Sequence, residues 1–132
     1  MWFTPRPKGI GIGELNVIIR DVLLGVRWLH SHGFVHRDIR WANIIKETNG
    51  RVRLIDLEHT AHEGPFVGPT LVHWPALPGG EYRKTTDLYL VGRLVEEYTC
   101  LSGQDADVER FTSMLQRGIS VEMALQDLWV AV

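Results

Sequence analysis

The sequence has a single cysteine, no long apolar run and no excess of positive charge. Because Cys100 is alone, no disulfide can form within the chain, and its place at the end of an apolar helix favours a small core residue over a nucleophile. No apolar stretch approaches the roughly 20 residues that span a bilayer. The N-terminus also lacks the basic-then-apolar order of a signal peptide. We therefore expect a soluble protein without a membrane partner, either cytoplasmic or nuclear, or secreted if a signal sequence is missing from this chain.

The net charge of −2 argues against a nucleic-acid-binding protein whose affinity rests on positive charge. Residues 1–53 contain nine Lys and Arg against four Asp and Glu, whereas residues 54–132 contain five against twelve. This asymmetry either favours phosphate groups near the first half of the chain or reflects an uneven surface without function. A length of 132 residues and a hydrophobic fraction of 45% are typical of one globular domain.

Prolines and glycines are frequent in residues 1–13, which we expect to form a hinge-like connector before a single domain of residues 14–132. From Glu14 to Leu29, apolar side chains recur at spacings of three and four, which predicts a helix with one buried face. Gly33 follows, and glycine suits the left-handed conformation that often ends a helix. A long amphipathic helix is therefore the first predicted element.

Two short strands, residues 44–46 and 52–55, flank Asn49-Gly50, a dipeptide typical of hairpin turns. Residues 59–82 are rich in glycine and proline and predict a long irregular segment, of a length that is usually functional or disordered. Ser120 is a candidate N-cap. Three further helices are predicted at residues 88–98, 106–117 and 121–130. The first of them is apolar on most sides, which places it in the core of a mainly helical α+β fold.

Residues 36–43, with the sequence His-Arg-Asp-Ile-Arg-Trp-Ala-Asn, place a carboxylate and an amide five positions apart on one loop. Asp56 follows the second predicted strand. The Asp38 carboxylate could accept a proton from an attacking hydroxyl, whereas Asn43 and Asp56 offer hard oxygen ligands to Mg²⁺. This pattern is typical of a magnesium-nucleotide site and indicates phosphoryl-transfer chemistry.

The order of a long helix, this loop, a hairpin, Asp56-Leu57-Glu58, an irregular segment and a helix with Asp87 resembles the C-terminal lobe of the protein-kinase fold over nearly the whole chain. Thr4-Pro5, residues 20–23 and residues 29–45 look more narrowly like fungal protein-kinase-like proteins, including the kinase-like modules of Crinkler-type effectors. The resemblance implies ATP and Mg²⁺ as cofactors.

The resemblance also assigns roles to the loop. It implies that Asp38 is the catalytic base and that Asn43 and Asp56 bind Mg²⁺ and, through it, the nucleotide. Arg40 stands where kinases that modify Ser or Thr usually keep a lysine that contacts the transferred phosphoryl group; its guanidinium retains the charge. Three further roles concern structure: His36 would brace the loop by packing, Arg37 would pair with a phosphorylated Thr60 or Thr70, and Asp87 would tie its helix to the loop backbone. The alternative for Asp87 is an ordinary acid in the first turn of a helix.

The pattern departs from the kinase fold in three places. Leu57 and Glu58 replace the usual Phe-Gly, so that Glu58 is either a further metal-site carboxylate or an exposed side chain. The usual Ala-Pro-Glu is not recognisable in residues 74–78. About 13 residues precede the first helix, without the Gly-rich loop and lysine of an N-terminal lobe, so we expect weak ATP binding and slow or absent phosphoryl transfer if this lobe is missing.

We expect a protein partner or a second copy to cover the face that would meet the missing lobe, with Trp2, Phe3 and Trp41 near it. Three functions stay open. The chain could be a catalytically impaired binding or effector module, an active ATP- and Mg²⁺-dependent Ser/Thr-type kinase lobe completed by another chain or segment, or a relative of small-molecule kinases. The remaining histidines fit no common zinc spacing and are predicted to have surface or capping roles: His30, His32, His59, His62 and His73.

Overall fold

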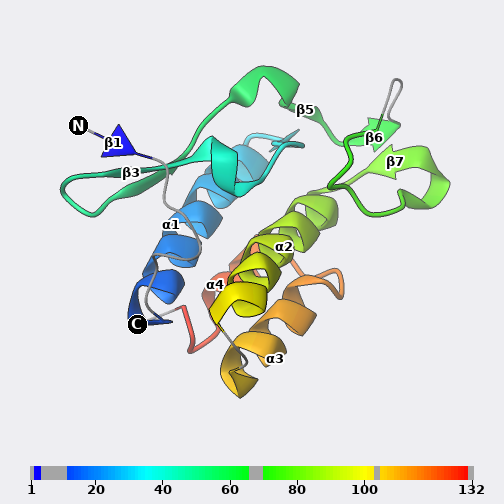
Figure 1. Cartoon of the computed structure of the whole chain (residues 1–132). Helices are drawn as coiled ribbons and strands as arrows, with labels where there is room; N and C mark the ends of the chain where they lie inside the picture. The colour runs from blue at the N-terminus through cyan, green and yellow to red at the C-terminus, as the bar shows by residue number, and fades with distance from the viewer. Residues whose placement is uncertain (1, 4–11, 66–69, 103–104, 131–132) are drawn as a thin grey trace.

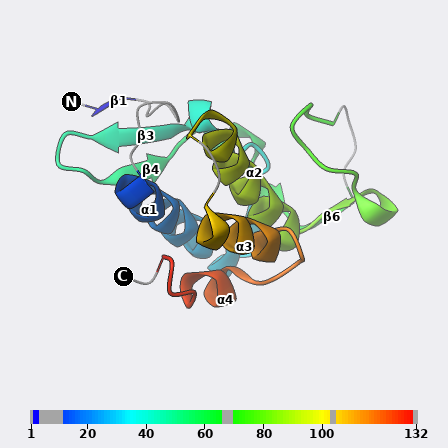
Figure 2. The same ribbon diagram turned by 60° about the horizontal axis from the view of Figure 1, so that its bottom comes forward.

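The computed structural model describes residues 2–3, 12–65, 70–102 and 105–130. Two long helices, α1 (Ile12–Ser31) and α2 (Lys84–Ser102), pack against each other in the centre of the fold (Figure 1). Helix α3 (Ala106–Leu115) packs against α2, and α4 (Val121–Leu125) packs against α1. Figure 2 shows α1 between the hairpin of β3 (Ile44–Glu47) and β4 (Val52–Leu54) on one side and α4 on the other. The predicted α+β architecture is confirmed.

Helix α1 follows the predicted apolar stripe closely. Leu15, Ile19, Val22 and Val26 are fully buried, as the spacing of three and four requires of one helical face. The helix ends at Ser31, and Gly33 adopts a φ of 81°, the left-handed conformation that its sequence position suggested.

The predicted hairpin is also present, with Ile44 opposite Leu54 in an antiparallel register. Gly50 adopts a φ of 89° at the turn, where glycine carries no steric cost. The pairing of β1 (Trp2–Phe3) with β3, which is antiparallel and extends this sheet, was not predicted. Residues 4–11 of the expected connector lie outside the described residues.

The segment predicted to be irregular is fastened at both ends by small antiparallel sheets. Strand β2 (Phe34–Val35), in the predicted loop, pairs with β5 (Ala61–His62). Strand β6 (Gly64–Pro65) pairs with β7 (Glu81–Tyr82), immediately before α2. These sheets hold the two ends of the segment close to the candidate site, whereas residues 66–69 lie outside the described part.

Helix α2 is buried on most sides, as predicted, with Leu88, Leu90, Val91, Leu94 and Val95 in the core. The side chain of Cys100, which was predicted to lie in the core, is outside the described residues. No helix in the described ranges combines the length and the apolar character that crossing a membrane would require.

The two C-terminal helices are shorter than predicted. The Ser120 side chain caps α4 by accepting a hydrogen bond from the Met123 N–H, as expected, but the helix ends at Leu125 instead of near residue 130. The cause is Asp127, whose Oδ1 accepts a hydrogen bond from the Trp129 N–H at 2.9 Å. A side chain that bonds the nearby backbone in this way competes with helical hydrogen bonding. Trp129 is half-buried and packs on Phe111, with ring centroids 4.9 Å apart.

Candidate active site

The loop from His36 to Asn43 connects β2 to β3, and its backbone contains an unusual conformation. In the described part of the chain, Arg37 and Asp56 are the non-glycine residues with positive φ, at 73° and 64°. A left-handed conformation costs a residue with a side chain about 1–2 kcal/mol, and it persists where the surroundings enforce it. Arg37 lies in this loop and Asp56 follows β4, and both belong to the predicted catalytic motif, which we take as the candidate active site.

Asp38 and Asn43, the predicted base and metal ligand, are in direct contact. Asn43 Nδ2 donates hydrogen bonds to the Asp38 carbonyl oxygen and to Asp38 Oδ2, each at 2.8 Å. Both residues are buried. Within the described residues, this orientation leaves Asn43 Oδ1 without a donor, so the oxygen remains available to a cation.

Asp56 follows β4, and the residue before it contacts the loop. The Ile55 N–H donates to the Asn43 carbonyl oxygen at 2.8 Å, which fixes the residue before Asp56 against the loop. The Asp56 side chain is exposed and forms no hydrogen bond or ion pair with other described residues. In the described ranges, no three His, Cys, Asp or Glu side chains are grouped to hold a metal. A Mg²⁺ ion here would depend on Asn43, Asp56 and nucleotide phosphates, which suits its preference for few protein ligands.

His36 stabilises the loop from its buried side. Its side chain is fully buried, Nε2 donates to the Ile55 carbonyl oxygen at 3.0 Å, and Nδ1 accepts from the Asp38 N–H at 3.1 Å. With both ring nitrogens engaged, the imidazole has no position from which to move a proton to a substrate. The geometry therefore supports the predicted bracing role.

Asp87, in the first turn of α2, is the main anchor of this loop. Its Oδ2 accepts a hydrogen bond from the His36 N–H at 2.8 Å, and its Oδ1 accepts one from the Arg37 N–H at 3.2 Å. The carboxylate is fully buried, so Asp87 is not an ordinary exposed acid at a helix terminus. The loop is thus tied to the central helix, as the resemblance implied.

Two further partners of Asp87 were missed by the sequence analysis. His30 Nε2 donates to Oδ2 at 2.9 Å, and the Tyr82 hydroxyl donates to Oδ1 at 2.5 Å. Burial, together with the charge and hydrogen bond of Asp87, raises the pKa of Tyr82 well above its usual value. The predicted surface or capping role of His30 is wrong, since its side chain is 4% exposed. Its position four residues after buried Val26 was the clue, because both lie on one helical face.

Arg40 and His73 both approach the remaining oxygen of the candidate base. Arg40 Nε lies 3.2 Å from Asp38 Oδ1, and His73 Nε2 lies 3.4 Å from the same atom. The Asp38 side chain is left 3% exposed. Burial lowers the pKa of His73, although the negative charge of Asp38 opposes this shift. His73, predicted to have a surface or capping role, instead has a half-buried side chain beside Asp38. The neighbouring Trp74 fixes this part of the segment by donating to the Arg37 carbonyl oxygen at 2.7 Å.

Arg37 is held by the segment that contains its predicted phosphorylation partners. Its Nε donates to the His59 carbonyl oxygen, directly before Thr60, whose hydroxyl oxygen is buried without a hydrogen-bond partner among the described residues. Thr70 is exposed. Glu58 is exposed too, and its Oε1 lies 3.3 Å from His59 Nε2. This favours an exposed side chain over a metal-site carboxylate.

The prediction that Trp41 lies near an open face is wrong. Its side chain is buried, and Nε1 donates to the Leu94 carbonyl oxygen of α2 at 3.1 Å. Trp41 is therefore a core anchor that joins the end of the loop to the central helix. The side chains of Trp2 and Phe3, which were predicted to share that face, lie outside the described residues.

Comparisons with known proteins agree with this geometry. A model of the protein kinase domain matches residues 4–65. Similar relatives are dual serine/threonine and tyrosine protein kinases of Danio rerio, 33% identical, and of Gallus gallus and Homo sapiens, each 37% identical, all over 96 residues. Each match covers 70% of this chain but 10–11% of the relative, so the chain spans about a tenth of the length of these proteins. The matches and the α+β architecture together show a protein-kinase-like fold.

Proposed function

We propose that this chain supplies the catalytic loop and the metal ligands of an ATP- and Mg²⁺-dependent protein kinase. The observation that carries the proposal is the double hydrogen bond from Asn43 Nδ2 to the carbonyl oxygen and the carboxylate of Asp38. It orients the candidate base and, at the same time, directs Asn43 Oδ1 away from it, where a cation can bind. The names of the similar relatives, which are protein kinases, support the same class of reaction.

In this proposal a hydroxyl of a protein substrate transfers its proton to Asp38 as its oxygen attacks the γ-phosphorus of ATP. The new oxygen–phosphorus bond forms as the bond to the bridging oxygen of ADP breaks, so the products are a phosphoprotein, ADP and a protonated carboxyl group. Bound Mg²⁺ would neutralise phosphate charge. Asn43 and Asp56 would hold the ion, and Arg40 would place a guanidinium beside the transferred group.

A second candidate is a catalytically impaired binding or effector module. The observation that favours it is the position of Arg40 and His73 over Asp38 Oδ1, where a substrate hydroxyl would have to arrive. We also infer that transfer needs groups that clamp the ATP phosphates from the opposite side. A further segment of the same protein, a protein partner or a second copy of the chain would supply them.

Thermal unfolding with increasing Mg-ATP tests the proposal. If the nucleotide binds, 100 times its dissociation constant should stabilise the folded state by about 2.7 kcal/mol. The Asp56→Asn variant should lose this stabilisation, whereas the matched control Asp107→Asn, an exposed acid in the first turn of α3, should keep it.

Transfer of labelled phosphate from ATP to a generic protein substrate then separates the two candidates. Asp38→Asn should retain Mg-ATP binding and lower the transfer rate by about 10²–10⁴. Stabilisation by Mg-ATP without any transfer, even with a complementary kinase lobe added, would support the catalytically impaired binding module. Absence of both binding and transfer with a complementary kinase lobe added would contradict the kinase proposal.

A further inference from the structure

Trp74 contacts the loop of the candidate base from a distant part of the chain. It lies between β6 and β7, 37 residues after Arg37, and its indole Nε1 donates to the Arg37 carbonyl oxygen at 2.7 Å. The half-buried ring also packs on Tyr82, with ring centroids 5.0 Å apart. The polar and the apolar parts of the Trp74 side chain are thus both engaged, so that the indole N–H is held in a fixed direction.

Arg37 adopts a backbone conformation that depends on its surroundings. Its φ of 73° is left-handed, which disfavours a residue with a side chain and persists where neighbouring groups enforce it. Asp87 Oδ1 accepts a hydrogen bond from the Arg37 N–H at 3.2 Å, on the N-terminal side of the residue. Trp74 binds the carbonyl oxygen on the C-terminal side. The two contacts therefore fix the peptide units before and after the left-handed residue.

The Arg37 carbonyl oxygen belongs to the same peptide unit as the Asp38 N–H. Because a trans peptide unit is planar, its oxygen and its N–H point in opposite directions. The N–H donates to His36 Nδ1 at 3.1 Å, while the oxygen accepts from Trp74. Rotation of the unit would break both hydrogen bonds. Trp74 and His36 thus hold opposite edges of the unit from which the Asp38 side chain begins.

We propose that Trp74 is a positioning residue for the candidate base. Its indole N–H fixes the peptide unit between Arg37 and Asp38, and this keeps the Asp38 carboxylate in place for the hydrogen bond from Asn43 Nδ2. The inference rests on the proposed function, since it adds a residue to the same site. It assigns Trp74 no contact with a substrate or a nucleotide, so that the indole acts on Asp38 through the backbone alone.

Solution NMR of the whole chain, without ATP or Mg²⁺, tests the inference. Trp74→Phe retains a ring that can pack on Tyr82 but removes the indole donor. The backbone signals of Arg37 should shift, because they report its left-handed φ. The Asp38 amide proton should exchange with solvent about two- to tenfold faster, as expected for the loss of one hydrogen bond that keeps the peptide unit in place.

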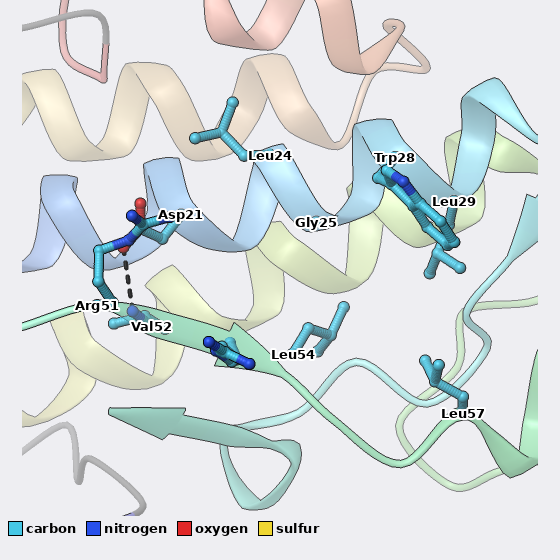
Figure 3. Close-up of a pocket in the computed structure, with 10 residues that line it drawn as sticks. Asp21, Leu24, Gly25, Trp28, Leu29, Arg51, Val52, Leu54 and Leu57 are labelled. Atoms are coloured by element: carbon cyan, nitrogen blue, oxygen red, sulfur yellow. Dashed lines mark hydrogen bonds between the residues drawn. The ribbon is translucent and has the colours of Figure 1, made fainter. Parts of the chain in front are cut away.

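Trp28→Phe is the matched control, because it makes the same chemical change elsewhere. Figure 3 shows Trp28 on α1, where it lines the pocket between this helix and β4, and the residue is 61% exposed. This variant should leave the Arg37 and Asp38 signals unchanged. The two indoles also provide a comparison within the unmodified chain: the Trp74 indole proton should exchange more slowly than that of Trp28, by about tenfold or more.

A second variant separates Trp74 from its neighbour His73, whose Nε2 lies 3.4 Å from Asp38 Oδ1. Loss of the indole could act by releasing this imidazole instead of the backbone. On the present inference, His73→Gln should leave the backbone signals of Arg37 in place. If His73→Gln reproduced the changes of Trp74→Phe, the base would be positioned by the imidazole and the inference would be wrong.

Unchanged Arg37 signals and an unchanged Asp38 exchange rate in a folded Trp74→Phe variant would overturn the inference. Changes spread over the whole chain, or a Trp74 indole proton that exchanges as fast as that of Trp28, would overturn it as well. Phosphate transfer with a complementary kinase lobe gives a second readout: Trp74→Phe should lower kcat by about tenfold or more at an unchanged KM for ATP. An inactive unmodified chain would contradict the proposed function only, since the NMR experiments contain no nucleotide.

Discussion

His73 Nε2 lies 3.4 Å from Asp38 Oδ1, so a residue of the segment between β6 and β7 covers the candidate catalytic base. The contact joins a neutral or cationic imidazole to a buried carboxylate, and Arg40 shares the same oxygen. Access of a hydroxyl group to Asp38 therefore depends on the position of this segment. The titration of His73 should also be visible in the pH dependence of the free energy of unfolding.

Acidification should destabilise the protein through His73. Burial lowers the pKa of this imidazole in the folded state, despite the opposing charge of Asp38, so the unfolded state takes up a proton first as the pH falls through about 6.5. The resulting slope should stay below about 1.4 kcal/mol per pH unit, since solvent screens a partly exposed side chain. His73→Gln should flatten the pH dependence of urea unfolding between about pH 5 and 7. Val72→Gln, at the fully exposed neighbour, is the control, and equal slopes in both variants would contradict the assignment.

Removing the charge of Asp87 should destabilise the fold. Asp87→Asn leaves the His36 and Arg37 N–H groups and His30 facing an amide in place of a carboxylate, at an expected cost of about 2–5 kcal/mol. Urea denaturation measures this change. Asp107→Asn, an exposed acid in the first turn of a helix, should cost less than about 1 kcal/mol. Similar values for the two variants would mean that Asp87 is an ordinary helix-terminal acid.

Alkaline conditions should destabilise the protein through Tyr82. Burial and Asp87 raise the pKa of its hydroxyl, so above about pH 10 the unfolded state loses this proton while the folded state keeps it. The free energy of unfolding should then fall by at most about 1.4 kcal/mol per pH unit. Tyr82→Phe should remove this slope and cost about 1–2 kcal/mol at neutral pH, because the hydrogen bond to Asp87 is lost. A slope that persists in Tyr82→Phe and disappears in the control Tyr89→Phe would refute the assignment.

Trp41 should contribute to stability as a core residue. Trp41→Phe removes the hydrogen bond to the Leu94 carbonyl oxygen and part of a buried ring, which should cost about 1–3 kcal/mol. Trp28→Phe makes the same chemical change at an exposed position and should cost less than about 0.5 kcal/mol. Equal midpoints of urea denaturation for the two variants would contradict this expectation.

The two long helices and the placement of Asp38 and Asn43 on one loop could be predicted because short sequence spacings determine them. An apolar stripe orients α1, and five residues of loop bring the base to its amide. His73 could not be placed in this way, since the segment around it has no periodicity and reaches the site through distant pairings.

His30 and Trp41 show a second limit of sequence analysis. A polar or aromatic side chain on an apolar face can be either buried with a partner or turned towards solvent, and composition does not distinguish the two. In both cases the deciding partner is remote in sequence: Asp87 lies 57 residues after His30, and Leu94 lies 53 residues after Trp41. The short β1 pairing was missed for the same reason, because strand edges recruit partners through backbone groups that every residue carries.

At Asp56, the left-handed backbone favours a residue other than the one proposed to bind Mg²⁺. Glycine adopts this conformation without steric cost, so an Asp56→Gly replacement should relieve strain and make the chain more robust. A design procedure that ranks variants by melting temperature alone would select that replacement. It would yield a more stable protein that lacks the carboxylate proposed to bind Mg²⁺.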